Sequence, residues 1–227
     1  MRVALIALFA ALSLVHLYAC YFKLRRLRAL TKPGLLLLLA VFYLAFAPTF
    51  KPHVFLALLF GMAGDILLIS DGRQMRFIIG AVCFSIGHVL YGYTLFCTTG
   101  AFAASPGLWL PLVLALPYAA AVALTARRLS PYVRERHLRK LMPVYLGLVG
   151  AVNIGAWLTL FAALRAEAMP QAFAASLLVL GSLLFLVSDT VLSCSMFMRK
   201  PSHANFYVML TYISAQALLT AGFMLYF

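Results

Sequence analysis

Long apolar segments alternate with short polar connections along the whole chain. Each segment is bounded by charged residues, Pro or Gly, and most approach the roughly 20 residues that a helix needs to cross the hydrocarbon core of a bilayer. We therefore predict an all-α polytopic membrane protein of about eight transmembrane helices, forming one domain over residues 1–227. The predicted helices cover residues 3–22, 33–49, 53–70, 77–98, 108–125, 141–164, 171–197 and 204–226.

The composition agrees with this pattern. Of the 227 residues, 65% are hydrophobic and only 10% are charged, and the mean hydropathy is +1.03, which leaves too little polar surface for a soluble globule. The formal net charge of +13 would suggest nucleic-acid binding in a soluble chain. Here the basic residues form short clusters between apolar segments, as orientation signals do, so we expect no nucleic-acid partner.

The distribution of these basic residues predicts an orientation in the membrane. Fifteen of the 18 Lys and Arg residues fall in the connections after the first, third, fifth and seventh segments, and only three fall on the other side. Basic loops are retained in the cytoplasm. We predict a multi-pass protein of the bacterial inner membrane with cytoplasmic basic loops, both termini outside and an even number of helices.

Two halves of four segments resemble each other. Gly64-Asp65-Ile-Leu-Leu in the third segment is echoed by Ser188-Asp189-Thr-Val-Leu in the seventh. Lys32-Pro33 at the start of the second is echoed by Lys140-Leu-Met-Pro143 at the start of the sixth. Halves of four helices have the same orientation, so the pattern predicts a parallel four-plus-four repeat about an axis along the membrane normal.

Asp65 and Asp189 are the acidic residues that the pattern places in hydrocarbon, whereas Asp71, Glu135 and Glu167 fall in loops. An ionised carboxylate at the bilayer centre costs at least about 2.5 to 3.5 kcal/mol, so an intramembrane acid indicates a functional site with a partner. The alternative is an Asp that only holds helices together.

Other polar residues of the membrane segments gather at the same depth. A rise of 1.5 Å per residue places Asp65 about 9 Å from Asp71 and His88 about 18 Å from Arg76, within the cytoplasmic half. Polarity in one leaflet favours a cavity open to the cytoplasm and the inner leaflet over a path through the membrane. Individually, the tyrosines and Gln216 could also be interhelical hydrogen-bonders, and Lys32 could set topology or hold a phosphate at a helix start. The candidate residues are Asp65, Asp189 and His88 for catalysis and Lys32, Tyr91, Tyr145, Tyr212 and Gln216 for substrate binding.

The sequence gives little support for a catalytic metal site or a catalytic Ser or Cys nucleophile. A catalytic zinc site needs about three protein ligands, and only His16 and His88 lie well inside the membrane segments. The four cysteines show neither metal-ligand nor CxxC spacing, and no GxSxG motif occurs. We expect no metal and no cofactor.

Six segments in order resemble the YhhN family of integral membrane lysoplasmalogenases. The resemblance implies an eight-helix fold that hydrolyses the vinyl ether bond of a lysoplasmalogen, a lysophospholipid, to a fatty aldehyde and a glycerophospho-ethanolamine or -choline. It implies lysoplasmalogen and membrane lipid as partners. The matching segments are Thr31-Lys-Pro33, Gly64-Asp65-Ile-Leu-Leu, Gly80-Ala-Val-Cys-Phe-Ser-Ile-Gly-His88-Val-Leu-Tyr91, Met142-Pro-Val-Tyr145, Gly181-Ser-Leu-Leu-Phe-Leu-Val-Ser-Asp189 and Thr211-Tyr-Ile-Ser-Ala-Gln216.

Two carboxyls suit this chemistry independently of the resemblance. A vinyl ether is hydrolysed by protonation at carbon, which gives an oxocarbenium ion that water then attacks, so one acid must start neutral and one base charged. In a medium of low dielectric, two neighbouring carboxyls lose their protons at different pH values, so one can stay protonated while the other is charged. The acid and base pair of glycosidases has the same arrangement. Asp65 and Asp189 could divide these roles in either order. The alternatives are a hydrolase of another lysophospholipid that uses the same Asp pair and a proton-coupled transporter or lipid-binding protein.

Overall fold

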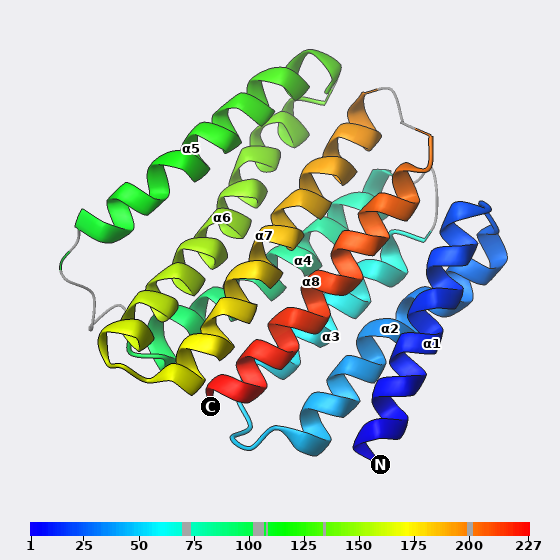
Figure 1. The fold of residues 1–227 in the computed structure, drawn as a ribbon. Helices are drawn as coiled ribbons and strands as arrows, with labels where there is room; N and C mark the ends of the chain where they lie inside the picture. The colour runs from blue at the N-terminus through cyan, green and yellow to red at the C-terminus, as the bar shows by residue number, and fades with distance from the viewer. Residues whose placement is uncertain (70–73, 102–106, 108, 134, 199–201) are drawn as a thin grey trace.

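The structure, a computed structural model, describes residues 1–69, 74–101, 107, 109–133, 135–198 and 202–227. The described residues form the predicted all-helical fold with eight α-helices (Figure 1). The α-helices are α1 (Arg2–Tyr21), α2 (Arg25–Phe46), α3 (Pro52–Leu67), α4 (Gln74–Tyr93), α5 (Trp109–Leu129), α6 (Arg136–Arg165), α7 (Met169–Phe197) and α8 (Ala204–Tyr226). A π-helical turn, η1 (Thr94–Thr98), follows α4, and a 3-10 turn, η2 (Ser130–Tyr132), follows α5.

Seven helices of the described chain are long and apolar enough to cross a membrane, as a multi-pass protein requires. The eighth, α3, has 16 residues. At 1.5 Å per residue α3 is about 24 Å long, shorter than a hydrocarbon core of about 30 Å. Asp65 lies in the last turn of α3, so the short helix ends close to this buried carboxyl.

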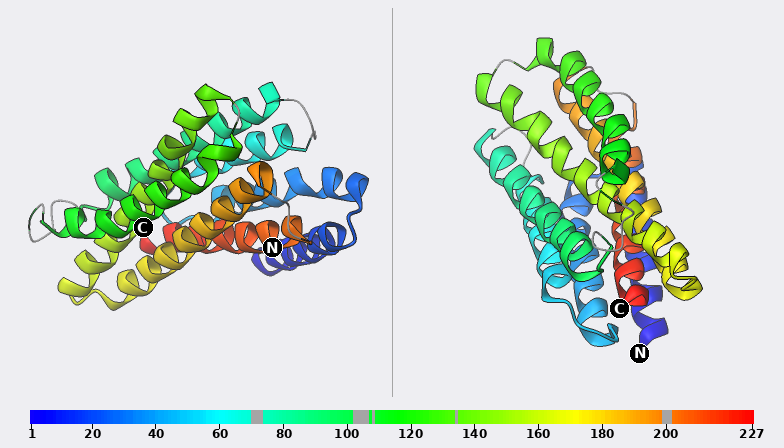
Figure 2. Two further views of the ribbon diagram at one scale, coloured as in Figure 1. Left: turned by 90° about the horizontal axis from the view of Figure 1, so that it is seen from above. Right: turned by 90° about the vertical axis from the view of Figure 1, so that its left-hand side faces the viewer.

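Six helices form a closed ring, and two pack on its outside. Around the ring, α2, α3, α4, α6, α7 and α8 contact each other in that order, and α8 closes the ring on α2. Helix α1 packs on α2 and α8, and α5 packs mainly on α6 at the opposite edge (Figures 1 and 2). Within each half, consecutive helices are neighbours, but α1 also contacts α8 whereas α5 also contacts α7, so the parallel repeat stays a prediction. Both termini lie at the same end of the bundle (Figure 1), as an even number of crossings requires.

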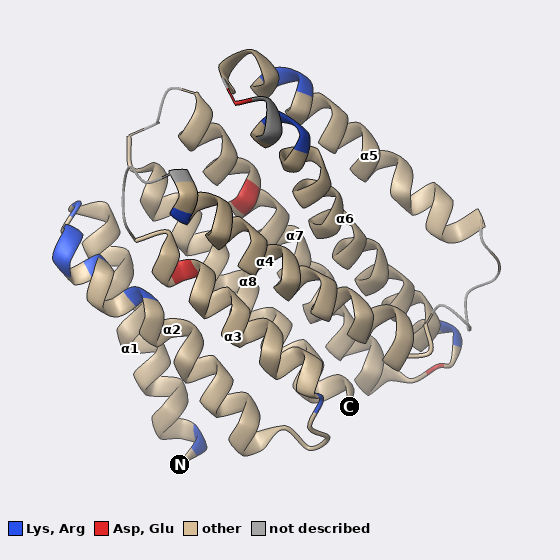
Figure 3. Cartoon of the chain, turned by 180° about the vertical axis from the view of Figure 1, so that it is seen from behind, with Lys and Arg blue, Asp and Glu red and all other residues tan. Residues whose placement is uncertain are grey.

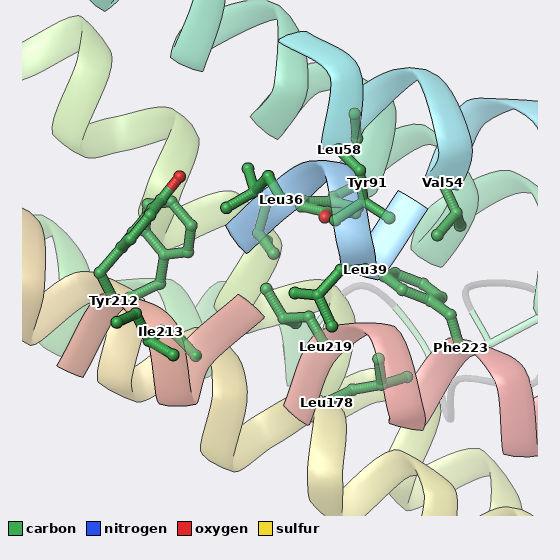
Figure 4. Packing of buried hydrophobic residues seen from close by; sticks show 14 of the residues in the cluster. Leu36, Leu39, Val54, Leu58, Tyr91, Leu178, Tyr212, Ile213, Leu219 and Phe223 are labelled. Carbon is green, nitrogen blue, oxygen red and sulfur yellow. The ribbon is translucent and has the colours of Figure 1, made fainter. Parts of the chain in front are cut away.

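The interior of the ring is filled by apolar side chains from all sides. Leu36 and Leu39 from α2, Leu58 from α3, and Leu219 and Phe223 from α8 are buried there (Figure 4). Helices α7 and α8 form the most extensive helix–helix contact of the described chain, and glycines there allow the backbones to approach closely. A Cβ added at Gly181 would lie 3.0 Å from the carbonyl oxygen of Ala215. Small residues at such contacts are typical of helix packing in membranes.

Two predicted helix starts are wrong. We predicted that Lys32-Pro33 opens the second helix, but α2 begins at Arg25, so both residues lie inside it. Likewise α6 begins at Arg136, and Pro143 lies within it. Arg, Leu and Ala are strong helix formers, so the basic turns continue the helix beyond the apolar segment. The loop residue Asp71 and the ends of the predicted helices at residues 70 and 108 lie outside the described residues.

Candidate functional site

Asp65 is held by two side chains from two other helices. Its Oδ1 lies 3.0 Å from Nζ of Lys32 on α2, and its Oδ2 accepts a hydrogen bond of 2.9 Å from the Tyr212 hydroxyl on α8. Asp65 is 1% exposed, and the Lys32 side chain is 15% exposed. A Cβ at the preceding Gly64 would meet the Phe84 ring at 2.7 Å, so glycine lets α4 pack directly beside this pair.

Asp189 on α7 is 4% exposed and has a different set of neighbours. The Tyr145 hydroxyl on α6 donates a hydrogen bond of 2.5 Å to its Oδ2. In the described part of the chain, no basic side chain forms an ion pair with Asp189. The two carboxyls therefore have similar burial but different charge compensation.

A polar cavity of about 270 Å³ joins the two acids. Asp65, Asp189, Lys32 and Tyr212 line its wall, together with Arg28 of α2. Most Lys and Arg positions gather toward one end of the bundle, and the acidic positions within the helices lie in the half nearer to that end (Figure 3). The cavity therefore holds two acidic and two basic side chains near the basic end of the protein, and its volume is enough for several water molecules.

An apolar cavity of about 120 Å³ adjoins the polar one between α4, α6 and α7. Asp189 lines both cavities, as do Phe84 and Leu192, whereas Asp65 lines only the polar one. The apolar wall includes Ile78 and Met142. Asp189 consequently stands at the boundary between a space suited to water and one suited to a hydrocarbon chain.

Three predicted site residues, Tyr91, Gln216 and His88, line neither the polar nor the apolar cavity. Tyr91 donates a hydrogen bond of 3.0 Å to Oε1 of Gln216, and neither residue lines the polar cavity. His88 donates from Nδ1 to the carbonyl oxygen of Phe84 at 2.7 Å. Its ring lies edge-on to that of Tyr145, with 5.7 Å between centroids. A catalytic role for His88 stays a prediction.

The lining of the polar cavity also includes four polar residues that are not among the predicted candidates: Arg28, Ser188, Ser195 and Asn205. Arg28 lines the polar cavity four residues before Lys32, on the same face of α2. We had counted it only as a topology signal because the second helix was predicted to begin at residue 33. A helix start at Arg25 would have placed both side chains together. No group of three His, Cys, Asp or Glu side chains that could hold a metal occurs among the residues described.

Fold and site together define a multi-pass helical membrane protein with a pair of buried carboxyls between a basic mouth and an apolar cavity. The comparison with family models then gives the family: the model of the YhhN family matches residues 27–223, nearly the whole chain. The chain belongs to the YhhN family, as its six segments predicted. Neither the curated proteins nor the solved structures contain a match.

Proposed function

We propose that this protein hydrolyses the vinyl ether bond of lysoplasmalogens, with Asp65 and Asp189 as base and acid. The observation that carries the proposal is the shared cavity, in which one buried carboxyl is ion-paired and the other has no ion-pair partner among the described residues. Such a pair supplies the charged base and the neutral acid that vinyl ether hydrolysis needs.

The charge partners assign the two roles. Asp65 is the carboxylate, because the Lys32 ammonium at 3.0 Å compensates its charge. Asp189 is the neutral acid, because a buried carboxylate with no ion-pair partner among the described residues would be costly in this setting. The Tyr145 hydroxyl then donates to the carbonyl oxygen of Asp189 and leaves its acidic proton free.

The cavity arrangement fits the order of atoms in the substrate. The carbon to be protonated carries the hydrocarbon tail, and Asp189 lines the apolar cavity that would receive this tail. The neighbouring carbon, which carries the ether oxygen, would face the polar cavity with Asp65 and water. One apolar cavity beside Asp189 would receive one hydrocarbon chain, which favours a lysolipid as the substrate class.

The reaction is then a closed cycle of proton transfers. Asp189 donates its proton to the tail-side carbon, and the oxygen-bearing carbon becomes an oxocarbenium ion. Asp65 takes a proton from the water that adds to this ion, which gives a hemiacetal. In its collapse, the hemiacetal hydroxyl returns a proton to Asp189, and Asp65 protonates the departing glycerol oxygen. The aldehyde and the glycerophospho product leave, and both acids regain their starting states.

A substrate panel tests the proposal. Purified protein in detergent is incubated with vinyl ether, saturated ether and ester lysolipids of equal chain length and headgroup, and the products are identified by mass. We expect aldehyde from the vinyl ether lipid alone. In heavy water, aldehyde trapped by reduction should carry one deuterium on carbon 2. Fatty acid from the ester lipid would instead indicate a different lysophospholipid hydrolase, and solute uptake into proteoliposomes without cleavage would indicate a transporter.

A further inference from the structure

Three basic residues form a row on one face of α2. Arg25, Arg28 and Lys32 are spaced by three and four residues, so their side chains lie above one another along the helix. All three line a small cavity of about 60 Å³ beside the end of α3, and Arg28 and Lys32 also line the polar cavity. The row therefore runs from the edge of the bundle to the buried carboxyls.

The charges along this row are compensated unequally. Lys32 is paired with Asp65. No carboxylate of the described residues forms an ion pair with Arg25 or Arg28, and Nε of Arg28 is buried without a hydrogen-bond partner among them. A buried donor without a partner is costly unless a ligand completes it. An anion in the cavities that Arg28 lines would compensate the charge of its guanidinium.

We propose that Arg28, assisted by Arg25, binds the phosphodiester group of the lysolipid substrate. This inference rests on the proposed function and names the part of the substrate that the basic row recognises. A guanidinium binds phosphate oxygens through paired hydrogen bonds, which suits it to this role better than an ammonium. Lys32 is committed to Asp65 and serves the reaction itself.

The distances agree with this placement. Six bonds separate the oxygen-bearing vinyl carbon from phosphorus, about 7 Å at the rise of roughly 1.2 Å per bond of an extended chain. Four residues separate Lys32 from Arg28, about 6 Å along the helix. A substrate with its vinyl ether at the carboxyls thus brings its phosphate to the level of Arg28. In the protein, the carboxyls lie between Arg28 and the apolar cavity. In the substrate, the vinyl ether lies between the phosphate and the hydrocarbon tail, so the two sequences of groups match.

The test compares Arg28→Gln with Arg26→Gln on two substrates. Arg26 is exposed, is not among the residues that line either cavity and serves as the matched control. One substrate is lysoplasmalogen, and the other is 1-alkenylglycerol, which has the vinyl ether but no phosphate. For Arg28→Gln we expect KM for lysoplasmalogen to rise about tenfold or more, the range of a lost charged hydrogen bond. The values for alkenylglycerol should stay within about twofold, and Arg28→Lys should lie between the wild type and Arg28→Gln.

A binding measurement separates this inference from the proposed function. A saturated 1-alkyl lysophospholipid and the matching alkylglycerol cannot be hydrolysed at a vinyl bond, and their Kd values report recognition alone. Wild-type protein should prefer the phosphate-bearing lipid, and Arg28→Gln should remove the preference. Loss of the preference supports the phosphate site even if no aldehyde is formed from any substrate. If Arg28→Gln keeps both the preference and the wild-type KM, the phosphate site is wrong while the hydrolase proposal stands.

Discussion

Lys32 and Asp65 lie 3.0 Å apart with little access to water, so each needs the other in the folded state. The sequence marked both residues as candidates but could not pair them, because it does not show which helices become neighbours. Asp189 was marked in the same way, and its partner Tyr145 comes from a helix of the same half of the chain. Residue types and depth were therefore predictable, and the partners and the division of roles came only from the packing.

Substitution of one member of the ion pair tests this residue-scale account. Lys32→Met leaves a buried carboxylate without its counter-ion, and we expect the free energy of unfolding in detergent to fall by about 3–5 kcal/mol. Adding Asp65→Asn in the same chain should recover much of this loss without restoring aldehyde release. Lys23→Met, at an exposed lysine between α1 and α2, is the control. Equal unfolding midpoints for Lys32→Met and Lys23→Met would contradict a buried, energetically coupled pair.

At the scale of the elements, apolar segments located all eight helices but misplaced two of their starts. A helix can begin before its apolar segment does, because long basic side chains can continue the helix while their charged ends reach polar surroundings. In α2 this extension carries Arg25 and Arg28 into line with Lys32. The two arginines that the sequence interpretation missed thus follow from one error in a helix boundary.

The contact between α7 and α8 gives a prediction for an element. Gly181→Ala places a Cβ 3.0 Å from the Ala215 carbonyl oxygen, a backbone atom that cannot turn aside, and we expect a loss of about 1–3 kcal/mol of stability. Gly147→Ala in α6 is the matched control, because nothing lies within 4 Å of its added Cβ. That control should be neutral or gain up to about 1 kcal/mol from helix propensity. Thermal unfolding in detergent measures both, and equal losses would contradict the close approach.

For the whole molecule, consecutive helices form a ring of six with two outer helices, and the repeat predicted from two short motifs stays a prediction. The even number of helices followed from the basic residues, and it agrees with termini at one end of the bundle (Figure 1). The sequence predicts a polar cavity in one leaflet but not the full set of residues that line it, because its walls come from helices in both halves of the chain.

The orientation of the whole molecule in the membrane is testable by fusions at the C-terminus. Because the basic connections should face the cytoplasm, we expect Phe227 to lie outside. In a bacterial host, alkaline phosphatase fused after Phe227 should be active, and green fluorescent protein fused there should be dark. The same reporters fused after residue 132, in the connection between α5 and α6, should give the reverse. Fluorescence at the C-terminal fusion would overturn the predicted orientation.

The rate of aldehyde release by Asp65→Asn and Asp189→Asn tests the central claim most directly. Asn keeps the size of each side chain and one acceptor oxygen but neither donates a carboxylic proton nor accepts one as a base. Each variant, purified and shown to unfold cooperatively, should release aldehyde from lysoplasmalogen at least about 100-fold more slowly than wild type, as expected for loss of a general acid or base. A folded variant of either aspartate that works at the wild-type rate would contradict catalysis by this pair.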